Sequence, residues 1–164
     1  MAQDVKNRIK IPLRTKLFIF IASIIIILVS VFSYTTYYHD YYELQDKYGI
    51  VLKHIAINAS MQIDGKKHSK IKNERDFKKP EFIELRNKLY KIMKANYLTE
   101  ETLYTFRVDK SNKLRFVVML QKKPFIGHVY TPPEKNQMYF QKVLNGLALN
   151  TPIYTDKHGI WISG

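Results

Sequence analysis

A continuous apolar run near the amino terminus is the strongest pattern in this sequence. It reads LFIFIASIIIILVSVFSY from Leu17 to Tyr34, and the uncharged stretch continues through Tyr38. As a helix with a rise of about 1.5 Å per residue, residues 17–38 span about 33 Å, which matches a hydrocarbon core of about 30 Å. A core helix of a soluble domain normally keeps a polar stripe, which this run lacks. The run therefore predicts a transmembrane helix over 17–38.

The run has two alternative interpretations. A secretory signal peptide has a shorter apolar region of about 7 to 15 residues and ends in small residues at its cleavage site. Here the run is longer and leads into the bulky sequence VFSYTTYYHDYY. A cleaved signal and a soluble core helix remain the alternatives to a permanent anchor.

The flanks of the run predict its orientation. Residues 1–16 form a basic tail with one acid, Asp4, and five basic residues: Lys6, Arg8, Lys10, Arg14 and Lys16. An excess of lysine and arginine stays on the cytoplasmic side. Tyrosines cluster after the run, as in an interfacial belt: Tyr34, Tyr37, Tyr38, Tyr41 and Tyr42. We expect the amino terminus to be cytoplasmic and residues 39–164 to lie outside the cytoplasm.

Helical periodicity continues beyond the run. Between Asp40 and Ile63, apolar residues recur at steps of three and four, which places them on one helix face: Leu44, Tyr48, Val51, Ile55, Ala59 and Ile63. With no helix breaker before Asp64 and Gly65, the pattern predicts one long helix from the membrane to this point. Its face is a dimer contact, a docking face for the domain, or both in succession.

The rest of the chain predicts a mixed domain. PEFIELRNKLYKIMKAN reads as a helix that begins at Pro80, stops near Asn96 and has an apolar face of Phe82, Leu85, Leu89 and Ile92. LYTFRVD and LRFVVML read as a hairpin, KPFIGHVYTPPE as an irregular loop, and KNQMYFQKVLNG as a short helix with Met138, Val143 and Leu144 inward. PIYTDKHGIWISG predicts strand, turn and strand, with the turn at 156–159. The fold class is α+β, with strands folded over the first helix.

Composition narrows the class of protein. About 125 residues follow the predicted span, enough for one modest domain, and the absence of cysteine excludes disulfides. The formal net charge is +13, of which +4 precedes the span and +9 follows it. The later lysines are scattered rather than gathered in one stripe, which favours a solvated surface near anionic lipid over nucleic-acid binding. No nucleic-acid partner is expected.

Motifs for catalysis or metal binding are lacking in the sequence. Asp64, Asp109 and Asp156 stand in turn-like contexts, which turn formation explains. The chain has no cysteine, no glycine-rich phosphate loop and no serine elbow. The histidines do not follow a metal-ligand motif: His39, His54, His68, His128 and His158. We expect no enzyme activity, no metal and no cofactor.

The outer segment resembles the Cache-type sensor modules, PAS-like extracytoplasmic domains of bacterial chemoreceptors, histidine kinases and cyclases. The resemblance covers about Leu52 to Gly164 and rests on LKHIAINASMQIDGKKHSKI, PEFIELRNKLYKI, LYTFRVD, IGHVY and IYTDKHGIWISG, in that order. Family members continue past the tryptophan-bearing strand into further strands, a second span and a cytoplasmic output module such as a kinase, cyclase or phosphatase. The resemblance therefore implies that this chain is an incomplete sensor, the first part of a longer receptor or a truncated product, located in the bacterial inner membrane.

The resemblance also implies a ligand site between the strand face and the loop that crosses it. The residues that map there are Tyr104, Arg107, Tyr130, Tyr154, Asp156 and Trp161. Arg107 has paired donors for a carboxylate and Asp156 suits an amine. The alternative is that the rings are core. Strand alternation separates Tyr104 from Arg107, so that not all six residues line one cavity.

Two functions remain open at this level. The first is the ligand-binding part of a membrane-anchored receptor, a homodimer through its long helix. The second is a membrane-tethered structural or interaction protein that dimerises through the same helix and binds no small molecule.

Overall fold

The computed structural model describes residues 12–156 and 159–164. The chain forms two compact units, Met1–Leu44 and Gln45–Gly164. Helix α1 (Leu13–Gln62) contributes to both, and its length confirms the prediction of one long helix that ends just before Asp64. The predicted basic tail lies mostly outside the described residues.

The described part of the first unit consists almost entirely of the amino-terminal part of α1. Its side chains from Leu17 to Phe32 are nearly all exposed, and this segment is long and apolar enough to cross a membrane. Nothing in the described chain covers these side chains. The described residues therefore contain one candidate membrane-spanning helix, near the amino terminus, which is consistent with single-pass insertion.

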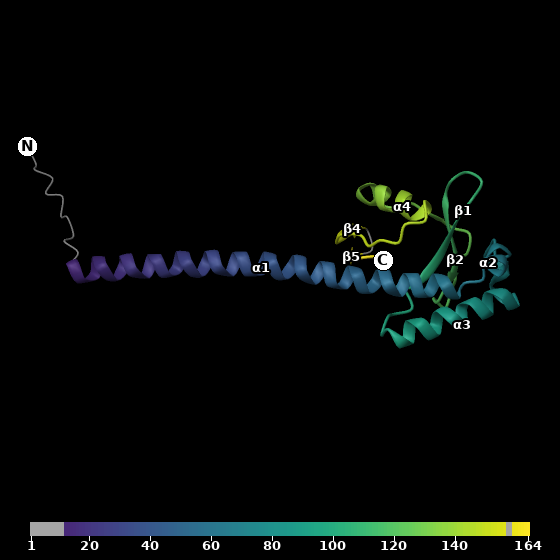
Figure 1. Ribbon diagram of the computed structural model, residues 1–164, viewed down its shortest axis with the longest axis horizontal. Coiled ribbons are helices and arrows are strands. Elements are labelled where there is room, and N and C mark those ends of the chain that lie inside the picture. Colours follow the sequence, from purple (N-terminus) through teal and green to yellow (C-terminus); the bar gives the residue numbers. More distant parts are fainter. Residues whose placement is uncertain (1–11, 157–158) are drawn as a thin grey trace, which may run out of the picture. The chain divides into compact units, whose positions relative to one another are not determined.

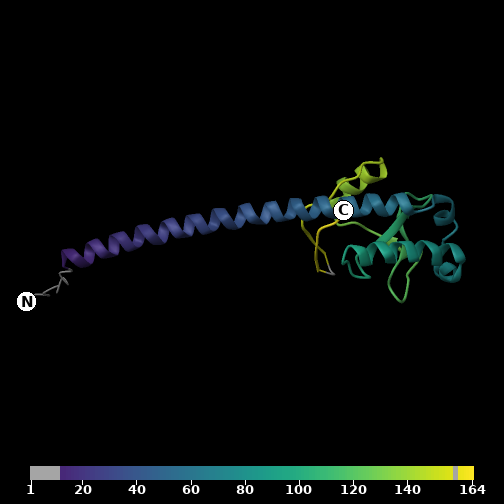
Figure 2. The same ribbon diagram turned by 60° about the horizontal axis from the view of Figure 1, so that its bottom comes forward.

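The second unit contains the rest of the elements, shown in Figures 1 and 2. After α1 come α2 (Gly65–Ser69), the 3-10 turn η1 (Glu74–Lys78), α3 (Pro80–Ala95), β1 (Tyr104–Val108), β2 (Leu114–Met119), β3 (Val129–Tyr130), η2 (Glu134–Asn136), α4 (Gln137–Leu144), β4 (Tyr154–Asp156) and β5 (Gly159–Trp161). This order confirms the α+β class. The sequence patterns did not indicate α2, η1 or β3, which are short.

Two antiparallel sheets carry the strands. The first has the order β1-β2-β3 and the second pairs β4 with β5. The predicted hairpin is formed by β1 and β2, whose register pairs Phe106 with Phe116 and Val108 with Leu114. The turn between them places Asn112 at a φ of 57°, a conformation that asparagine tolerates.

The core lies between β2, α3 and the last turns of α1. Its centre is Phe82, Leu85 and Leu89 from α3, packed with the buried Val117 and Val118 of β2. The three α3 residues belong to the predicted apolar face, and Pro80 occupies the start of the helix as expected. Periodicity therefore identified the buried face of α3 correctly.

The predicted apolar face of α1 is used only in part. Ile55 and Ala59 are buried in the core, whereas Leu44, Tyr48 and Val51 are exposed. Of the alternatives for this face, docking on the domain therefore holds for its second half, whereas its first half stays exposed.

A different side of α1 is covered instead. Gly49 is buried, and a Cβ at this position would lie 2.2 Å from Asn150 Nδ2. The backbone N–H of Ile153 donates to Gln45 Oε1 at 3.0 Å. The segment that leads into β4 therefore lies directly on α1, with the glycine leaving room for it.

Helix α4 corrects another prediction. Met138, Val143 and Leu144, expected to point inward, are exposed by 57%, 48% and 40%. The ring that faces the domain is Phe140, whose centroid lies 5.5 Å from that of Tyr130. A helix as short as α4 has only one or two inward positions. The inward position is that of Phe140, because its ring packs on the aromatic rings of Phe106 and Tyr130. Gly146 ends this helix with a φ of +87°, as the sequence indicated.

Candidate functional site

Five of the six predicted ligand-site residues come together. Strands β4 and β5 pair Tyr154 with Trp161 and Asp156 with Gly159. Tyr104 and Tyr130, from β1 and β3, lie near enough to Tyr154 and Asp156 for these groups to affect the pKa values of both. We call these five residues the tyrosine cluster: Tyr104, Tyr130, Tyr154, Asp156 and Trp161.

Hydrogen bonds fix the β4–β5 part of the tyrosine cluster. Oδ1 of Asp156 accepts from the indole Nε1 of Trp161 at 2.8 Å and from the backbone N–H of Gly159 at 3.2 Å. The hydroxyl of Tyr154 lies 3.0 Å from Oγ of Ser163. The carboxylate and the indole are thus held side by side at the end of the short hairpin.

The hydroxyls of Tyr104 and Tyr130 stay protonated over the physiological range. Burial raises the pKa of Tyr104 to about 12, with contributions from Tyr154 and Asp156. Burial, followed by the influence of Tyr154, raises the pKa of Tyr130 further above its usual range. The cluster therefore presents hydroxyl groups and one carboxylate beside its aromatic rings.

Aromatic side chains of the first sheet support this arrangement. The Phe106 ring lies 5.2 Å from that of Tyr104 and 4.9 Å from that of Tyr130, measured between centroids. Phe116 and Phe140 complete the contact, at 4.8 Å and 6.3 Å from Phe106. These rings pack against one another, which gives much of the aromatic surface a structural role as well.

Arg107 is the one predicted ligand-site residue that lies apart from the tyrosine cluster. Its Nη2 donates to the backbone carbonyl of Lys72 at 3.1 Å. Its neighbour Thr105 lies 2.8 Å from His68 Nε2, also on this side of β1, where burial and the charge of Arg107 lower the pKa of His68. Alternation along the strand, as the sequence indicated, accounts for the separation from Tyr104.

The segment around Lys72, whose carbonyl accepts from Arg107, packs closely against the loop of residues 126–128. Gly127 has a φ of +84°, and a Cβ on it would lie 2.6 Å from the carbonyl oxygen of Lys72. Only glycine fits here, since both the conformation and the space exclude a side chain. The same carbonyl thus meets Arg107 and the 126–128 loop, which gives Arg107 a structural role.

Asp76 fixes the backbone of the segment that contains Lys72. Its Oδ2 accepts from the backbone N–H of Lys72 at 2.7 Å, and its Oδ1 lies 2.8 Å from Lys79 Nζ. The hydrogen bond from Lys79 and then that from Lys72 lower the pKa of Asp76 from 3.8 to about 2. Its ionised form is therefore favoured in the folded chain.

This shift predicts a dependence of stability on pH. The pKa of Asp76 is lower in the folded chain than in the unfolded chain, so ionised Asp76 stabilises the fold. This contribution is complete above about pH 4 and disappears as the pH falls towards about 2. We expect Asp76→Asn to lower the free energy of unfolding by about 2 kcal/mol at pH 7. Denaturant unfolding between pH 7 and pH 2 should show the difference from wild type narrowing below about pH 4. The exposed Glu74→Gln serves as control, with a change below about 0.5 kcal/mol; an Asp76→Asn deficit that stays constant over this range would contradict the assignment.

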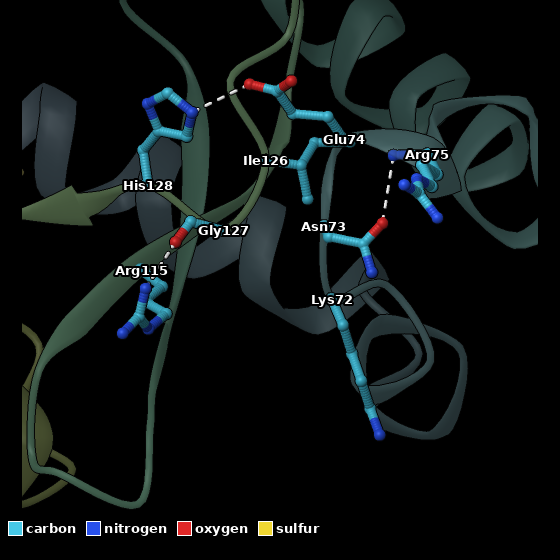
Figure 3. Close-up of a pocket in the computed structure, with 8 residues that line it drawn as sticks. All are labelled: Lys72, Asn73, Glu74, Arg75, Arg115, Ile126, Gly127 and His128. Atoms are coloured by element: carbon cyan, nitrogen blue, oxygen red, sulfur yellow. Dashed lines mark hydrogen bonds and ion pairs between the residues drawn. The ribbon is translucent and has the colours of Figure 1, made fainter.

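A wide surface hollow of about 560 Å³ lies next to this loop, as Figure 3 shows. It is lined by Lys72, Asn73, Glu74, Arg75, Arg115, Ile126, Gly127 and His128. Several polar groups in it bind one another: His128 Nε2 lies 2.8 Å from Glu74 Oε1, and Arg115 Nη1 donates to the carbonyl of Gly127 at 2.8 Å. None of the six predicted site residues lines it.

The three turn carboxylates act as the sequence indicated. Asp64 accepts from the backbone N–H groups of Lys66 and Lys67 at the start of α2. Asp109 accepts from those of Ser111 and Lys113 in the β1–β2 turn. Asp156 accepts within its own hairpin, whose residue His158 lies outside the described residues.

In the part of the chain that the structure describes, three side chains that could bind a metal ion lie together on α1. They are His39, Asp40 and Glu43, whose ligand atoms lie within 4.8 Å of one another. All three are exposed, and His39 lies 3.7 Å from Glu43. Spacing motifs did not single out this group, and its exposure on one helix face gives it no built coordination shell.

Sequence reasoning missed some neighbours of the tyrosine cluster. Phe106 and Phe116 share its face of the first sheet, and strand alternation gave a signal for both. Phe140 was missed because the inward face of α4 was assigned to other residues. Ser163 carried no signal, since its role arises only from the return of the chain beside Tyr154.

Comparison of this chain with protein-family models, with curated proteins and with solved structures finds no match.

Proposed function

We propose that this chain is the membrane-anchored, extracytoplasmic sensor part of a bacterial signal-transduction receptor, with a Cache-like domain that binds a small molecule at the tyrosine cluster. The observation that carries the proposal is the continuity of α1. One helix contains the apolar segment and also supplies Ile55 and Ala59 to the core of the folded domain. In this proposal a small displacement of the domain passes along α1, because helices shift as units when their packing changes.

The connection between the tyrosine cluster and α1 supports this proposal. Ile153, directly before β4, is bound to Gln45, and Asn150 packs on Gly49. A ligand that moves β4 and β5 would therefore act on α1 through close contacts, within the same unit. Coupling between two sites needs such a contiguous physical connection or a shared two-state element.

The membrane, its sidedness and dimerisation are parts of the same proposal. The lysine and arginine excess before the apolar segment favours a cytoplasmic amino terminus, and the resemblance to Cache modules favours the bacterial inner membrane. Leu44, Tyr48 and Val51 share one helix face and stay exposed, which suits a contact with α1 of a second copy.

The experiment uses the full chain in lipid nanodiscs. We expect at least one compound from a panel of amines, organic acids and amino acids to raise the unfolding temperature, because a ligand that binds only the folded state stabilises it. In parallel, single-cysteine variants report on α1, and the chain has no cysteine of its own. Val51→Cys should form disulfide-linked dimers at a rate that the ligand changes.

Ile50→Cys is the matched control. Ile50 is adjacent, β-branched and similarly exposed, at 47% against 54% for Val51, but lies about 100° away around the helix. Cross-linking at Val51 without any thermal shift would favour the second function, a membrane-tethered interaction protein without a ligand. The sensor proposal would be overturned if no compound gave a thermal shift and Val51→Cys did not cross-link in preference to Ile50→Cys.

A further inference from the structure

The surface hollow beside the Lys72 segment has no role in the proposed function. Its volume of about 560 Å³ lies within the range of about 300 to 1,000 Å³ that is usual for small-molecule sites. Arg115 of β2 and His128 of the following loop lie on one side of it, and residues 72–75 lie on the other (Figure 3). No residue of the tyrosine cluster lines it. The hollow is therefore a separate candidate site, built by segments far apart in sequence.

Basic side chains predominate in the lining of this hollow. It contains Lys72, Arg75 and Arg115, but a single carboxylate, that of Glu74. This carboxylate already has a partner, because its Oε1 lies 2.8 Å from His128 Nε2. Among the described residues, no carboxylate forms an ion pair with Lys72 or Arg75. Two cations of this part of the chain therefore border the hollow without a counter-ion.

Arg115 keeps a hydrogen-bond donor for a ligand. Its Nε donates to Asp109 Oδ2, and its Nη1 donates to the carbonyl of Gly127 at 2.8 Å. These bonds fix the guanidinium and leave its Nη2 without a partner among the described residues. A planar carboxylate binds arginine best through two parallel N–H bonds, and Nε is no longer available for such a pair. A phosphate, whose oxygens point in several directions, suits single donors from two sides of the hollow.

A further cation adjoins the lining. Arg107 is the direct partner of Arg115 in the antiparallel pairing of β1 with β2, and like charges at opposite positions destabilise a sheet. Asp109 compensates the charge of Arg115. The Arg107 guanidinium donates to the Lys72 carbonyl, and its Nε is buried with no hydrogen-bond partner in the described chain. An anion in the hollow would reduce the repulsion between the two arginines.

We propose that this hollow binds the phosphate group of a small molecule between Arg115 on one side and Lys72 and Arg75 on the other. A phosphate monoester carries a charge of about −1.5 to −2 at pH 7 and three strong acceptor oxygens, so it gains from all three cations. Glu74, in the same lining, opposes the anion. This inference goes beyond the proposed sensor function and does not depend on the tyrosine cluster.

Isothermal titration of the full chain in phosphatidylcholine nanodiscs tests the proposal. The ionic strength is held constant, because salt screens contacts between exposed charges. Glycerol 3-phosphate is the main probe, glycerate replaces its phosphate by a carboxylate, and glycerol lacks both charges. We expect glycerol 3-phosphate to bind at least tenfold more tightly than glycerate and glycerol, since several charge-assisted contacts give a factor of this size.

A fourth probe separates the two sources of a phosphate group. Glycerophosphoglycerol is a soluble lipid headgroup whose phosphodiester carries one negative charge. Tighter binding of glycerol 3-phosphate would assign the hollow to a free phosphate monoester. Tighter binding of glycerophosphoglycerol would assign it to a lipid headgroup, with the same phosphate chemistry.

Two variants locate the binding on the 72–75 side. We expect Lys72→Gln and Arg75→Gln each to weaken the binding of glycerol 3-phosphate about fivefold, because each removes one cation from the lining. Lys78→Gln is the matched control. Lys78 is also an exposed cation, lies in η1 together with Arg75 and is absent from the lining, so its loss should change the affinity less than twofold.

A variant with the opposite sign tests the role of charge in the site. Glu74→Gln removes the one carboxylate of the lining, and we expect it to strengthen the binding of glycerol 3-phosphate about threefold. Glu100→Gln removes the same charge from another exposed position outside the lining and should leave the affinity unchanged.

The outcomes that would overturn the proposal are distinct. They are absence of binding by both phosphate probes, equal affinity for glycerol 3-phosphate and glycerate, equal losses in Arg75→Gln and Lys78→Gln, or weaker binding by Glu74→Gln. None of these results would affect the sensor proposal, because the tyrosine cluster does not line the hollow. A thermal shift by another compound that persists in Arg75→Gln would support a ligand site elsewhere.

Discussion

Replacing Phe82 by alanine is expected to lower the free energy of unfolding by about 3 to 5 kcal/mol. Phe82 is 2% exposed and lies at the centre of the core, next to Leu85 and Leu89. The loss combines the transfer of a large ring to water with the cavity left behind, since well-packed surroundings relax only partly. A domain of this size is stable by about 5 to 15 kcal/mol, so this variant should populate the unfolded state measurably.

The measurement is denaturant unfolding of the full chain in detergent micelles, followed by fluorescence of the single tryptophan, Trp161. Ile83→Ala is the matched control on the same helix. Ile83 is 49% exposed, and we expect its truncation to cost less than about 1 kcal/mol. Similar losses for the two variants would mean that the inward face of α3 has been assigned wrongly.

The second large effect concerns the apolar segment. We expect the wild-type chain to remain in the membrane fraction after alkaline carbonate extraction, and the double variant Ile25→Asp, Val29→Asp to leave it. Each aspartate near the centre of a spanning helix costs about 2.5 to 3.5 kcal/mol, and each lost Ile or Val removes a further favourable contribution of about 0.3 to 0.6 kcal/mol. Both side chains are exposed, so that no protein contact compensates for the charge.

Aspartates placed further along the same helix provide the control. Tyr41→Asp with Tyr42→Asp adds the same charge on exposed positions of α1 beyond residue 38, and should leave the chain in the membrane fraction. Release of the wild-type chain by carbonate would exclude a transmembrane anchor. Equal release of the two double variants would indicate surface association rather than a span.

Local pattern predicted most of the elements. The three- and four-residue spacing of Phe82, Leu85 and Leu89 determined the buried face of α3, because residues at that spacing share one side of any helix. In the same way, alternation in β1 places Tyr104 and Arg107 on opposite faces of the strand. Such features depend only on backbone geometry, which neighbours in sequence share.

These local patterns did not predict how segments far apart in the sequence pack on one another. The sequence placed six apolar residues of α1 on one face but left its use open; the structure buries Ile55 and Ala59 of that face in the core and covers Gly49, on another side, with Asn150. In α4 the exposed Met138 was assigned inward in place of Phe140, because a short helix offers several similar apolar faces. Periodicity tells which residues share a face, but a neighbour far along the chain determines which face is buried.

The sequence by itself determined the apolar segment, the long helix, the α+β order of elements and the residue types available for a ligand. Only the tertiary structure decided that Tyr104 and Tyr130 lie near Tyr154 and Asp156 while Arg107 binds the Lys72 carbonyl. The physical reason is that helix and strand periods arise from local backbone geometry, whereas the meeting of β1 and β3 with β4 and β5 depends on how the whole chain packs its rings and hydrogen bonds around one core.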